Sequence, residues 1–504
     1  MLDVINILQL GEFDYNTAYS FPDYLDIEYA EKLVDVPKTM YDLVFVDRVL
    51  DDDEVELLYK VTKAYTLYVL EDIKLSETMK RYILCNKGKY IKRDDVQAFL
   101  CNDAKNYFAK PYGEKMRLSN FAIAQGFKGG VAWNGNYSLE LDGEYGEKFR
   151  QIIYLRHNIV VSKDTAVELW LEYDKSEMVE IQLDMTLFRR GDASAVLRKW
   201  TFDEKQLSEL IVLDNEIADG NIFVSIRAKG SGSFKLIGLH QRISRRGHGC
   251  FLPGGERKVC SNREELFYYF DPGNMKPPLN VYFSGYKTME GFEGYFMMKK
   301  MGCPFLLIAE PRLEGGAFYM GNKEYEDGVV DVIRKCMREL KFTSEQVILS
   351  GLSMGTFGAL YYGCDILPYA IILGKPLANV GDIATNERLH RPGGFPTSLD
   401  VINYMYGNIE NEAIEAANSR FWDKFDATPW KNTKFAVAYM IEDDYDRNAY
   451  NNLISHLKGD GVKIYGKGIH GRHNDASGAI ISWFKTQYNN ILDELSLDTK
   501  GIDT

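Results

Sequence analysis

The spacing of apolar residues changes twice along the chain, which predicts three units of different architecture. In the first unit, residues 1–112, continuous apolar runs within Val4–Gly11 and Tyr41–Leu50 end in Gly or Asp. Runs of this kind are typical of parallel strands that are covered on both faces. At Asp51–Thr62, apolar residues at helical spacing follow acidic residues, which predicts a helix. The first unit is therefore predicted to be a small α/β domain of Rossmann-like type.

The second unit, residues 113–250, alternates apolar and polar residues in segments that Gly, Asn and Asp separate. Such alternation predicts strands with one buried face, and many of them in succession predict a β-sandwich or jelly roll. A domain of this kind resembles carbohydrate-binding modules, which stack sugars on exposed aromatic side chains. Four aromatic residues are candidate sugar contacts, although core packing explains each of them equally well: Trp133, Tyr137, Trp170 and Tyr173.

The third unit, residues 251–504, alternates apolar runs of strand length with segments whose apolar residues recur at helical spacing. This alternation predicts an α/β fold with a mostly parallel sheet and helices on both faces. One part, Asn386–Asp400, contains Pro and Gly in close succession and is expected to be an irregular excursion between two strands.

Composition and charge indicate which binding partners and which cellular compartment to expect. The 504 residues carry a net charge of −13, which argues against nucleic-acid or anionic-lipid binding through bulk electrostatics. Seven cysteines without paired spacing are typical of a reducing compartment. The start of the chain lacks the pattern of a secretory signal, and the longest apolar runs are too short to span a membrane. A cytoplasmic protein is therefore expected.

Three other features are weaker candidates for sites. Asp47 follows a predicted strand, but no glycine-rich phosphate loop accompanies it, so a structural role is favoured over a nucleotide or phospho-acceptor site. The basic run Arg242–Gly249 is expected to be a solvated linker, with an acidic ligand or partner as the alternative. The histidines and cysteines show no ligand spacing, so no metal and no cofactor is expected.

The strongest chemical signal is the sequence Gly-Leu-Ser-Met-Gly at Gly351–Gly355, between an apolar run and a segment with helical spacing. A serine between two glycines at a strand-to-helix turn is the pattern of a nucleophile elbow. Acidic residues follow a later predicted strand, and a histidine follows the last one, so the order is Ser, acid, His as in α/β-hydrolases. Ser353 is therefore predicted to be a nucleophile.

The general base and its acid come from two other segments. His473 and His470 both lie in the loop after the last predicted strand, and His473 is preferred because it is nearer the closing helix. The strand at 435–441 is followed by three acidic residues, and a carboxylate there would orient the imidazole. Asp443 is favoured, Glu442 is close behind, and Asp444 is third. The remaining acidic residues are expected to face solvent or to cap helices.

Backbone N–H groups are expected to stabilise an oxyanion. The N–H of Met354 follows the nucleophile, and the turn Ser284–Lys287 should supply a second donor, with Tyr286 or a neighbour as the candidate. The loop Glu314–Gly321 lies beside the same sheet end and either shapes an acceptor pocket or is an ordinary long connection.

Several of these segments carry a resemblance to a known family. The runs "VYFSGYKTMEGFEGYF", "EPRLEGGAFYMGNKEYEDG", "ILSGLSMGTFGALYYG", "MIEDDYD" and "GRHND" resemble the second accessory secretory protein of the accessory Sec system. The predicted order of small α/β domain, β-sandwich and α/β-hydrolase domain is similar as well. Within the resemblance, Ser353 and His473 match the family's triad directly, whereas the acid matches only to within the Glu442–Asp443 pair.

The resemblance implies two activities. The first is a role in exporting serine-rich repeat glycoprotein adhesins, at the inner face of the membrane, beside two other accessory proteins, a SecA-type motor ATPase and a SecY-type channel. The second is O-acetylation of N-acetylglucosamine on the adhesin, from an acetyl donor that the sequence does not identify. Two alternatives stay open: a carboxylesterase or other hydrolase that uses the same triad, and a non-enzymatic scaffold of the translocation complex.

Overall fold

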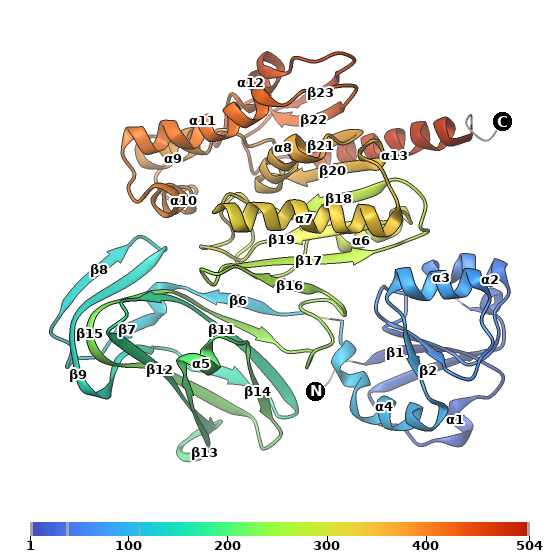
Figure 1. The fold of residues 1–504 in the computed structure, drawn as a ribbon, viewed down its shortest axis with the longest axis horizontal. Helices are drawn as coiled ribbons and strands as arrows, with labels where there is room; N and C mark the ends of the chain where they lie inside the picture. The colour runs from blue at the N-terminus through green and yellow to red at the C-terminus, as the bar shows by residue number, and fades with distance from the viewer. Residues whose placement is uncertain (1–3, 37–39, 110, 501–504) are drawn as a thin grey trace.

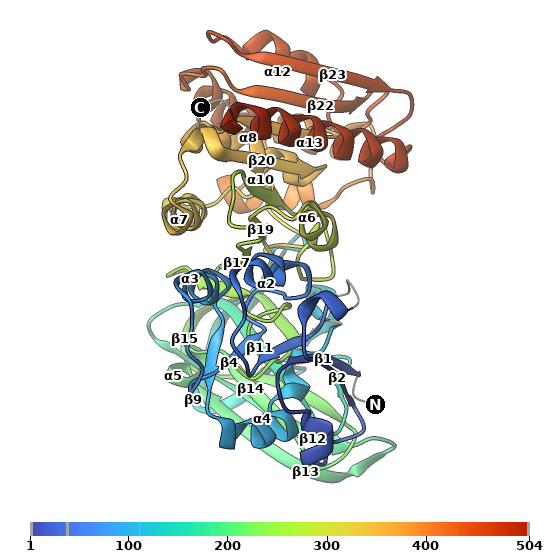
Figure 2. The same ribbon diagram turned by 90° about the vertical axis from the view of Figure 1, so that its right-hand side faces the viewer.

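The computed structural model describes residues 4–36, 40–109 and 111–500, whose strands form three separate β-sheets (Figure 1). We call the regions that contain these sheets the N-terminal unit (4–107), the middle unit (113–243) and the C-terminal unit (256–500). In Figure 2, the C-terminal unit lies above the other two. The extreme ends of the first and third predicted units, residues 1–3 and 501–504, lie outside the described residues.

The N-terminal unit is a five-stranded parallel sheet in the order β2-β1-β3-β4-β5. Helix α2 begins where the acidic residues predict it, because Asp51 and Glu54 form a capping box across its first turn. The elements are β1 Ile5–Leu10, α1 Tyr15–Ala18, β2 Leu25–Ala30, β3 Leu43–Val46, α2 Asp52–Leu57, β4 Leu67–Leu70, α3 Glu77–Asn86, β5 Lys89–Ile91 and α4 Val96–Asn102.

Asp47, at the end of β3, is buried against the protein's own donors. Its carboxylate accepts from Gln9 Nε2 at 2.9 Å and from Glu12 N at 3.2 Å. A Cβ on Gly11 would lie 1.7 Å from Asp47 Oδ1, so this close approach requires glycine. These contacts support a structural role for Asp47.

The middle unit contains ten antiparallel strands joined in one hydrogen-bonded sheet. The 24-residue strand β15 pairs with five others, and its register with β9 shifts at three points, which lets both long strands bend around one apolar core. The elements are β6 Gly113–Met116, β7 Phe121–Ile123, β8 Gly130–Asn134, β9 Ser138–Leu155, β10 Ile159–Val161, β11 Thr165–Lys175, β12 Val179–Arg189, β13 Asp192–Asp203, α5 Glu204–Leu207, β14 Ile211–Asn215 and β15 Gly220–Ile243.

The expectation that the basic run at 242–249 is a solvated linker is wrong. Arg242 is 2% exposed and binds Glu265 and Glu290, two carboxylates from the C-terminal part of the chain. Arg245 is 1% exposed and donates to the backbone oxygens of Asn106 and Phe251. The run fills the junction of the three units because guanidinium groups can satisfy several acceptors at once.

The C-terminal unit is an eight-stranded sheet in the order β16-β17-β19-β18-β20-β21-β22-β23, parallel from β19 to β23. Helices α6 and α13 contribute Met298, Phe484 and Tyr488 to the apolar cluster on one face, whereas α7, α8 and α11 pack on the other. The strands are β16 Glu256–Val259, β17 Glu265–Asp271, β18 Leu279–Phe283, β19 Phe305–Ala309, β20 Val347–Leu352, β21 Ala370–Gly374, β22 Lys434–Met440 and β23 Lys463–Ile469. The helices are α6 Tyr295–Met301, α7 Lys323–Leu340, α8 Met354–Ile366, α9 Val380–Leu389, α10 Thr397–Tyr406, α11 Asn411–Ala427, α12 Ala449–His456 and α13 Ser477–Lys500.

The connection from β21 to β22 is largely helical, so the expected irregular excursion at 386–400 is reduced to residues 390–396. Helices α9 and α10 flank this short connection and bury Ile383 and Val401 in the core. The Glu387 carboxylate accepts from Gly393 N at 2.5 Å and Phe395 N at 2.6 Å, which holds the connection in place. Among the described residues, no helix is both long and apolar enough to cross a membrane.

Candidate active site

Ser353 occupies a sharp turn between β20 and α8, at the carboxyl end of the parallel sheet. Its backbone has φ 52° and ψ −123°, a conformation that a non-glycine residue adopts only under strain. The Ser353 N–H donates to Gly374 O of the neighbouring strand at 2.8 Å, which anchors the turn to the sheet. This is the backbone geometry of a nucleophile elbow, which projects the serine hydroxyl away from the sheet.

The two glycines that flank Ser353 allow helix α8 to approach the sheet closely. A Cβ on Gly351 would lie 2.3 Å from the backbone of Gly355. A Cβ on Gly355 would lie 2.1 Å from Phe283 O at the end of β18. Real Cβ atoms do not approach other atoms this closely, so both positions require glycine.

Three predicted site residues from distant segments meet in one hydrogen-bonded chain. Ser353 Oγ lies 2.8 Å from His473 Nε2, and His473 Nδ1 lies 2.8 Å from Asp443 Oδ2. His473 is 2% exposed and Asp443 is 6% exposed, so the chain is largely shielded from water. The arrangement matches a serine, a general base and a carboxylate that orients the base.

Backbone donors fix the Asp443 carboxylate from the other side. Its Oδ1 accepts from Tyr445 N at 2.8 Å and from Asp446 N at 3.2 Å, while Oδ2 faces His473. These two hydrogen bonds fix the orientation of the carboxylate. Asp443 is therefore held as the partner of the imidazole.

The other acidic residues after β22 have different partners. Glu442 is exposed and accepts from Gly471 N at 2.7 Å, with His470 Nδ1 at 3.0 Å, so neither residue contacts His473. The Gly471 N–H and the His470 ring lower the pKa of Glu442. Asp444 Oδ1 accepts from the backbone N–H of His473 at 2.9 Å and so helps to hold this residue in place.

Asp446 is fully enclosed, although it was expected at the surface or at a helix cap. Its Oδ2 accepts from Ala378 N and Asn379 N at 2.8 Å each, just before α9. Burial raises the pKa of Asp446 to about 6. It ties the start of α9 to the loop that carries Asp443.

Aromatic and cationic groups support His473. The Tyr445 ring stacks on the imidazole with centroids 4.4 Å apart and planes 19° apart. The Arg391 guanidinium lies over the Tyr445 ring, 4.4 Å from its centroid, and its Nε lies 2.9 Å from Asp444 Oδ2. This stack restricts the ring orientation of the base.

Two backbone N–H groups beside Ser353 have no acceptor in the described part of the chain. Met354 is the first residue of α8, where an N–H has no helical acceptor, and Tyr286 lies in the turn after β18. The neighbouring N–H of Gly285 is occupied, since it donates to Glu293 Oε2 at 2.7 Å. Glu293 N in turn donates to Ser284 Oγ at 3.1 Å, which clamps the turn.

These groups line one cleft with a volume of about 460 Å³. Tyr286, Phe395, Pro396 and Tyr445 form an aromatic and apolar wall on it. Other residues line the cleft as well: Gly285, Glu293, Leu352, Ser353, Met354, Lys375, Leu377, Gly394, His473, Asn474, Ser477, Ile480 and Ile481.

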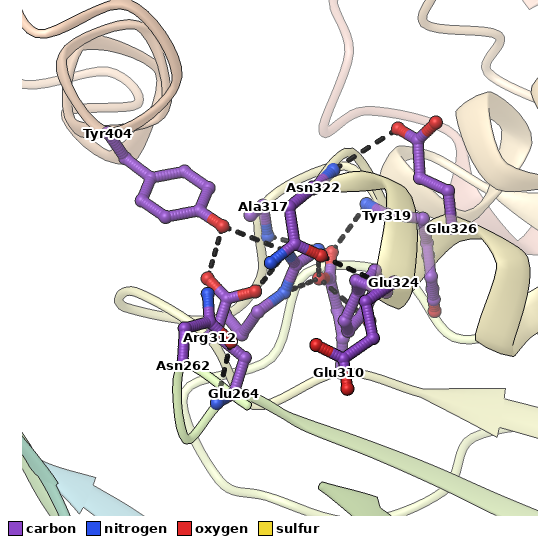
Figure 3. Close-up of polar contacts among 12 residues, drawn as sticks. Asn262, Glu264, Glu310, Arg312, Ala317, Tyr319, Asn322, Glu324, Glu326 and Tyr404 are labelled. Atoms are coloured by element: carbon purple, nitrogen blue, oxygen red, sulfur yellow. Dashed lines mark hydrogen bonds and ion pairs between the residues drawn. The ribbon is translucent and has the colours of Figure 1, made fainter. Parts of the chain in front are cut away.

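The loop after β19 packs directly behind the turn that carries Tyr286. Figure 3 shows the Glu310 carboxylate at its centre, where it accepts from Ala317 N at 2.7 Å and from Tyr319 N at 2.6 Å. Arg312 also donates to Glu310, with Nε at 2.8 Å. A Cβ on Gly316 would lie 2.3 Å from Met354 Cε, so this loop packs closely against the side chain of the first residue of α8.

The four candidate sugar contacts of the middle unit lie in different environments. Trp170 is 2% exposed, donates to Arg263 O at 2.9 Å and is covered by Arg257 and Arg263, so it is an interface residue. Trp133 is 47% exposed on β8. Tyr137 packs edge-on against Tyr404 of α10, and Tyr173 packs against Phe234.

Sequence spacing did not reveal a cluster of metal-ligand type at the junction of the middle and C-terminal units. Glu172, His240 and Glu265 come from β11, β15 and β17, and their ligand atoms lie within 4.8 Å of one another. Their charges are already met by basic side chains: Lys115 lies 2.8 Å from Glu172, and Arg242 binds Glu265 at 2.5 Å. The cluster is therefore an ion-pair network.

Sequence reasoning missed Lys375, Glu293, Tyr445 and Arg391 as parts of the site. Tyr445 is two residues beyond the favoured acid, and Lys375 directly follows β21, so position relative to strand ends was a usable signal. Glu293 and Arg391 lie in connections whose path the apolar pattern does not reveal.

Known proteins match this chain over nearly its whole length. Two curated proteins of the accessory Sec system are each 38% identical: one from Staphylococcus aureus over 96% of this chain and 92% of its own, and one from Streptococcus gordonii over 98% and 99%. The solved Glycosylation Associate Protein (Gap123) complex from Streptococcus agalactiae contains a chain that is 36% identical, with a TM-score of 0.84, covering 97% of this chain and 98% of that one. The family model described as "Accessory Sec system GspB-transporter" matches residues 5–496. This chain therefore belongs to the family of the second accessory secretory protein of the accessory Sec system.

Proposed function

We propose that the cleft around Ser353 catalyses acyl transfer, and that the chain is an O-acetyltransferase of α/β-hydrolase type. The observation that carries the proposal is the hydrogen-bonded chain from Ser353 Oγ through His473 to Asp443. A serine hydroxyl is a weak nucleophile unless a base removes its proton, and His473 is placed to do so.

The first step transfers the acetyl group to the protein. His473 Nε2 takes the proton from Ser353 Oγ as Oγ attacks the acetyl carbonyl carbon of the donor. A bond forms between Oγ and this carbon, the bond to the leaving group breaks, and His473 gives the proton to the leaving group. In the second step, an acceptor hydroxyl loses its proton to His473 and attacks acetyl-Ser353. A bond forms between the acceptor oxygen and the acetyl carbon, the bond from this carbon to Ser353 Oγ breaks, and Oγ takes the proton back from His473.

The tetrahedral intermediates of both steps carry a negative oxygen. The N–H groups of Tyr286 and Met354, which have no acceptor among the described residues, belong to residues that line this cleft and would donate to it. Asp443 keeps the Nδ1 proton of His473 in place and stabilises the imidazolium that forms in each step. Stacking of Tyr445 on the imidazole would hold the ring in the orientation that this transfer needs.

We further propose that the acceptor is N-acetylglucosamine on a serine-rich repeat adhesin, and that the chain takes part in the export of that adhesin. Membership of the family supports a role in the accessory Sec system. The full-length likeness to a chain of the Gap123 complex supports an assembly with two other accessory proteins. The same proposal places the protein in the cytoplasm, at the inner face of the membrane, beside a SecA-type motor and a SecY-type channel.

Mass spectrometry of adhesin glycans from cells with the wild-type or the Ser353→Ala protein tests this function. We expect acetylated N-acetylglucosamine only with the wild type, and adhesin export to continue with the variant, since export depends on other surfaces. Equal acetylation in both strains would contradict the transferase. Release of free acetate without acetylated glycan would indicate a hydrolase. Failure of a serine-directed probe to label Ser353 would indicate a non-enzymatic scaffold.

A further inference from the structure

Lys375 is a buried lysine at the floor of the cleft that contains Ser353. It directly follows β21, is 7% exposed, and lines the cleft together with Ser353 and His473. Its φ is 58°, the left-handed conformation that disfavours residues other than glycine. Its N–H donates to Ala438 O at 2.8 Å, which holds it at the sheet edge in this conformation. A strained lysine at a strand end beside the nucleophile points to a functional role.

The ammonium group of Lys375 has no counter-ion in the described part of the chain. Its Nζ donates to Ser477 Oγ at 2.9 Å, and no carboxylate oxygen of these residues lies within 4.0 Å of it. Burial lowers the pKa of Lys375, and the more distant carboxylates of Asp443 and Asp475 oppose this only in part. Buried charges are ordinarily paired, so an ammonium group without a counter-ion indicates a missing partner. One of its three N–H donors binds Ser477, and the other two are left for a ligand.

The ammonium group of Lys375 also lies beside the amino end of a helix, where a cation is electrostatically unfavourable. Ser477 is the first residue of α13, a helix of 24 residues whose amino end carries partial positive charge. The N–H groups of Ser477 and Gly478 have no acceptor among the described residues, and a Cβ on Gly478 would meet nothing within 4 Å. An anion placed between Lys375 and this helix end would therefore satisfy the ammonium, the free N–H groups and the helix dipole together.

We propose that Lys375 and the first turn of α13 bind an anionic group, a phosphate or a carboxylate, of the acetyl donor. This inference rests on the proposed acetyl transfer at Ser353. The anion is assigned to the donor because the proposed acceptor sugar, N-acetylglucosamine, is uncharged. A net charge of −13 would otherwise repel an anionic donor, so a local cation in the cleft is needed to hold it.

Binding in the Ser353→Ala protein tests the inference without any reaction. The phosphate arm compares 4′-phosphopantetheine with pantetheine, which differ only in the phosphate, and the carboxylate arm compares 3-mercaptopropionate with its amide. By calorimetry, we expect the charged member of at least one pair to bind about tenfold more tightly or better. Adding Lys375→Met should bring that ratio close to one, and Lys375→Arg should restore much of it. Equal binding within both pairs, or a ratio that survives Lys375→Met, would overturn the inference.

Kinetics separate this inference from the proposed function. With the S-acetyl derivative of each thiol, the ratio of acylation rates of Ser353 for charged and neutral donors should fall at least tenfold in Lys375→Met. Lys485→Met removes an exposed lysine from the same helix and should keep the ratio. Acylation of wild-type Ser353 at equal rates by both donors would overturn the inference and leave acetyl transfer standing. If no donor acylates Ser353, acetyl transfer fails and the binding ratios still decide the role of Lys375.

Discussion

At the scale of single residues, the acid of the proposed triad could not be chosen from the sequence. Glu442, Asp443 and Asp444 are consecutive, so no periodicity distinguishes them. In the structure their side chains point in different directions. Asp443 reaches the imidazole of His473, Asp444 accepts from its backbone N–H, and Glu442 lies at the surface beside His470. Ser353 and His473 were easier to predict, because the elbow glycines and the order of the segments each single out one position.

Replacing Asp443 by asparagine tests this choice. Asp443→Asn keeps the size of the side chain but leaves no carboxylate to hold the Nδ1 proton of His473, so the wrong tautomer faces Ser353. We expect the acylation rate of Ser353 to fall roughly ten-thousandfold, as in other serine triads. Rapid-mixing kinetics with a chromogenic acetate ester measures the rate.

The matched control is Glu442→Gln, one residue earlier. Glu442 is exposed and binds only His470 and Gly471 among the described residues, so its rate should stay within about twofold of the wild type. A large loss in Glu442→Gln, with little loss in Asp443→Asn, would assign the acid to Glu442.

At the scale of elements, the elbow depends on how closely β20, α8 and β18 approach. Gly355→Ala would place a Cβ 2.1 Å from Phe283 O, a backbone atom that cannot move aside. We expect the free energy of unfolding to drop by about 2–4 kcal/mol and the reactivity of Ser353 to be lost. Urea denaturation measures the first effect, and labelling by a fluorophosphonate the second.

Gly126→Ala is the control for this substitution. Nothing lies within 4 Å of a Cβ at Gly126, so its stability should match or slightly exceed that of the wild type. If both alanine variants were equally stable and reactive, the close approach at the elbow would not be the constraint that we infer.

The turn after β18 makes a second prediction at this scale, because Glu293 holds it by two hydrogen bonds. In Glu293→Ala the Gly285 N–H loses its carboxylate acceptor, while the backbone N–H of residue 293 can still donate to Ser284 Oγ. With one of its two bonds gone, we expect the turn to loosen and the Tyr286 N–H to move away from the oxyanion. We expect kcat to fall about tenfold to a hundredfold with KM little changed, since only the transition state uses this donor. Glu293→Gln still presents an oxygen to the Gly285 N–H and should restore most of the rate. Equal kcat in Glu293→Ala and the wild type would exclude this positioning role.

The same scale shows where the sequence was informative. The apolar runs at Val4–Gly11, Tyr41–Leu50 and 435–441 correspond to β1, β3 and β22, and the acidic residues from Asp51 mark the start of α2, because these signals are local. The helices between β21 and β22 and the burial of Arg242 were missed. Both depend on contacts between distant segments: α9 and α10 are stabilised by the core that they join, and Arg242 by Glu265 and Glu290. The local amino-acid composition does not predict contacts with segments that are far away in the sequence.

At the scale of the whole molecule, a buried ion network joins the middle and C-terminal units. His240 is fully buried, with Nδ1 2.5 Å from Glu290 Oε1 and Nε2 3.3 Å from Glu172 Oε2. Arg242 and Lys115 bind the same two carboxylates, and Glu265 lies 3.9 Å from the imidazole. Burial alone would lower the pKa of His240, but Glu290 and Glu172 outweigh it and raise the pKa.

A raised pKa makes the stability of this junction depend on pH. The protonated imidazole stabilises the folded protein fully below the unfolded pKa of about 6.5, and this contribution is lost as pH rises through the higher folded pKa. We therefore expect the free energy of unfolding to decrease as pH rises above about 6.5, measured by urea denaturation in a series of buffers. The decrease should flatten in His240→Gln. A pH slope that is the same in both proteins would show that His240 is not the group responsible.

The central claim is that Ser353 carries an acetyl group during the reaction. The most direct test is to incubate the full-length protein briefly with p-nitrophenyl acetate, digest it, and analyse the peptides by mass spectrometry. We predict one acetyl group on the peptide that contains Ser353, much slower to form in Asp443→Asn and absent in Ser353→Ala. Acetyl groups found only on lysines, with Ser353 unmodified in the wild type, would contradict the claim.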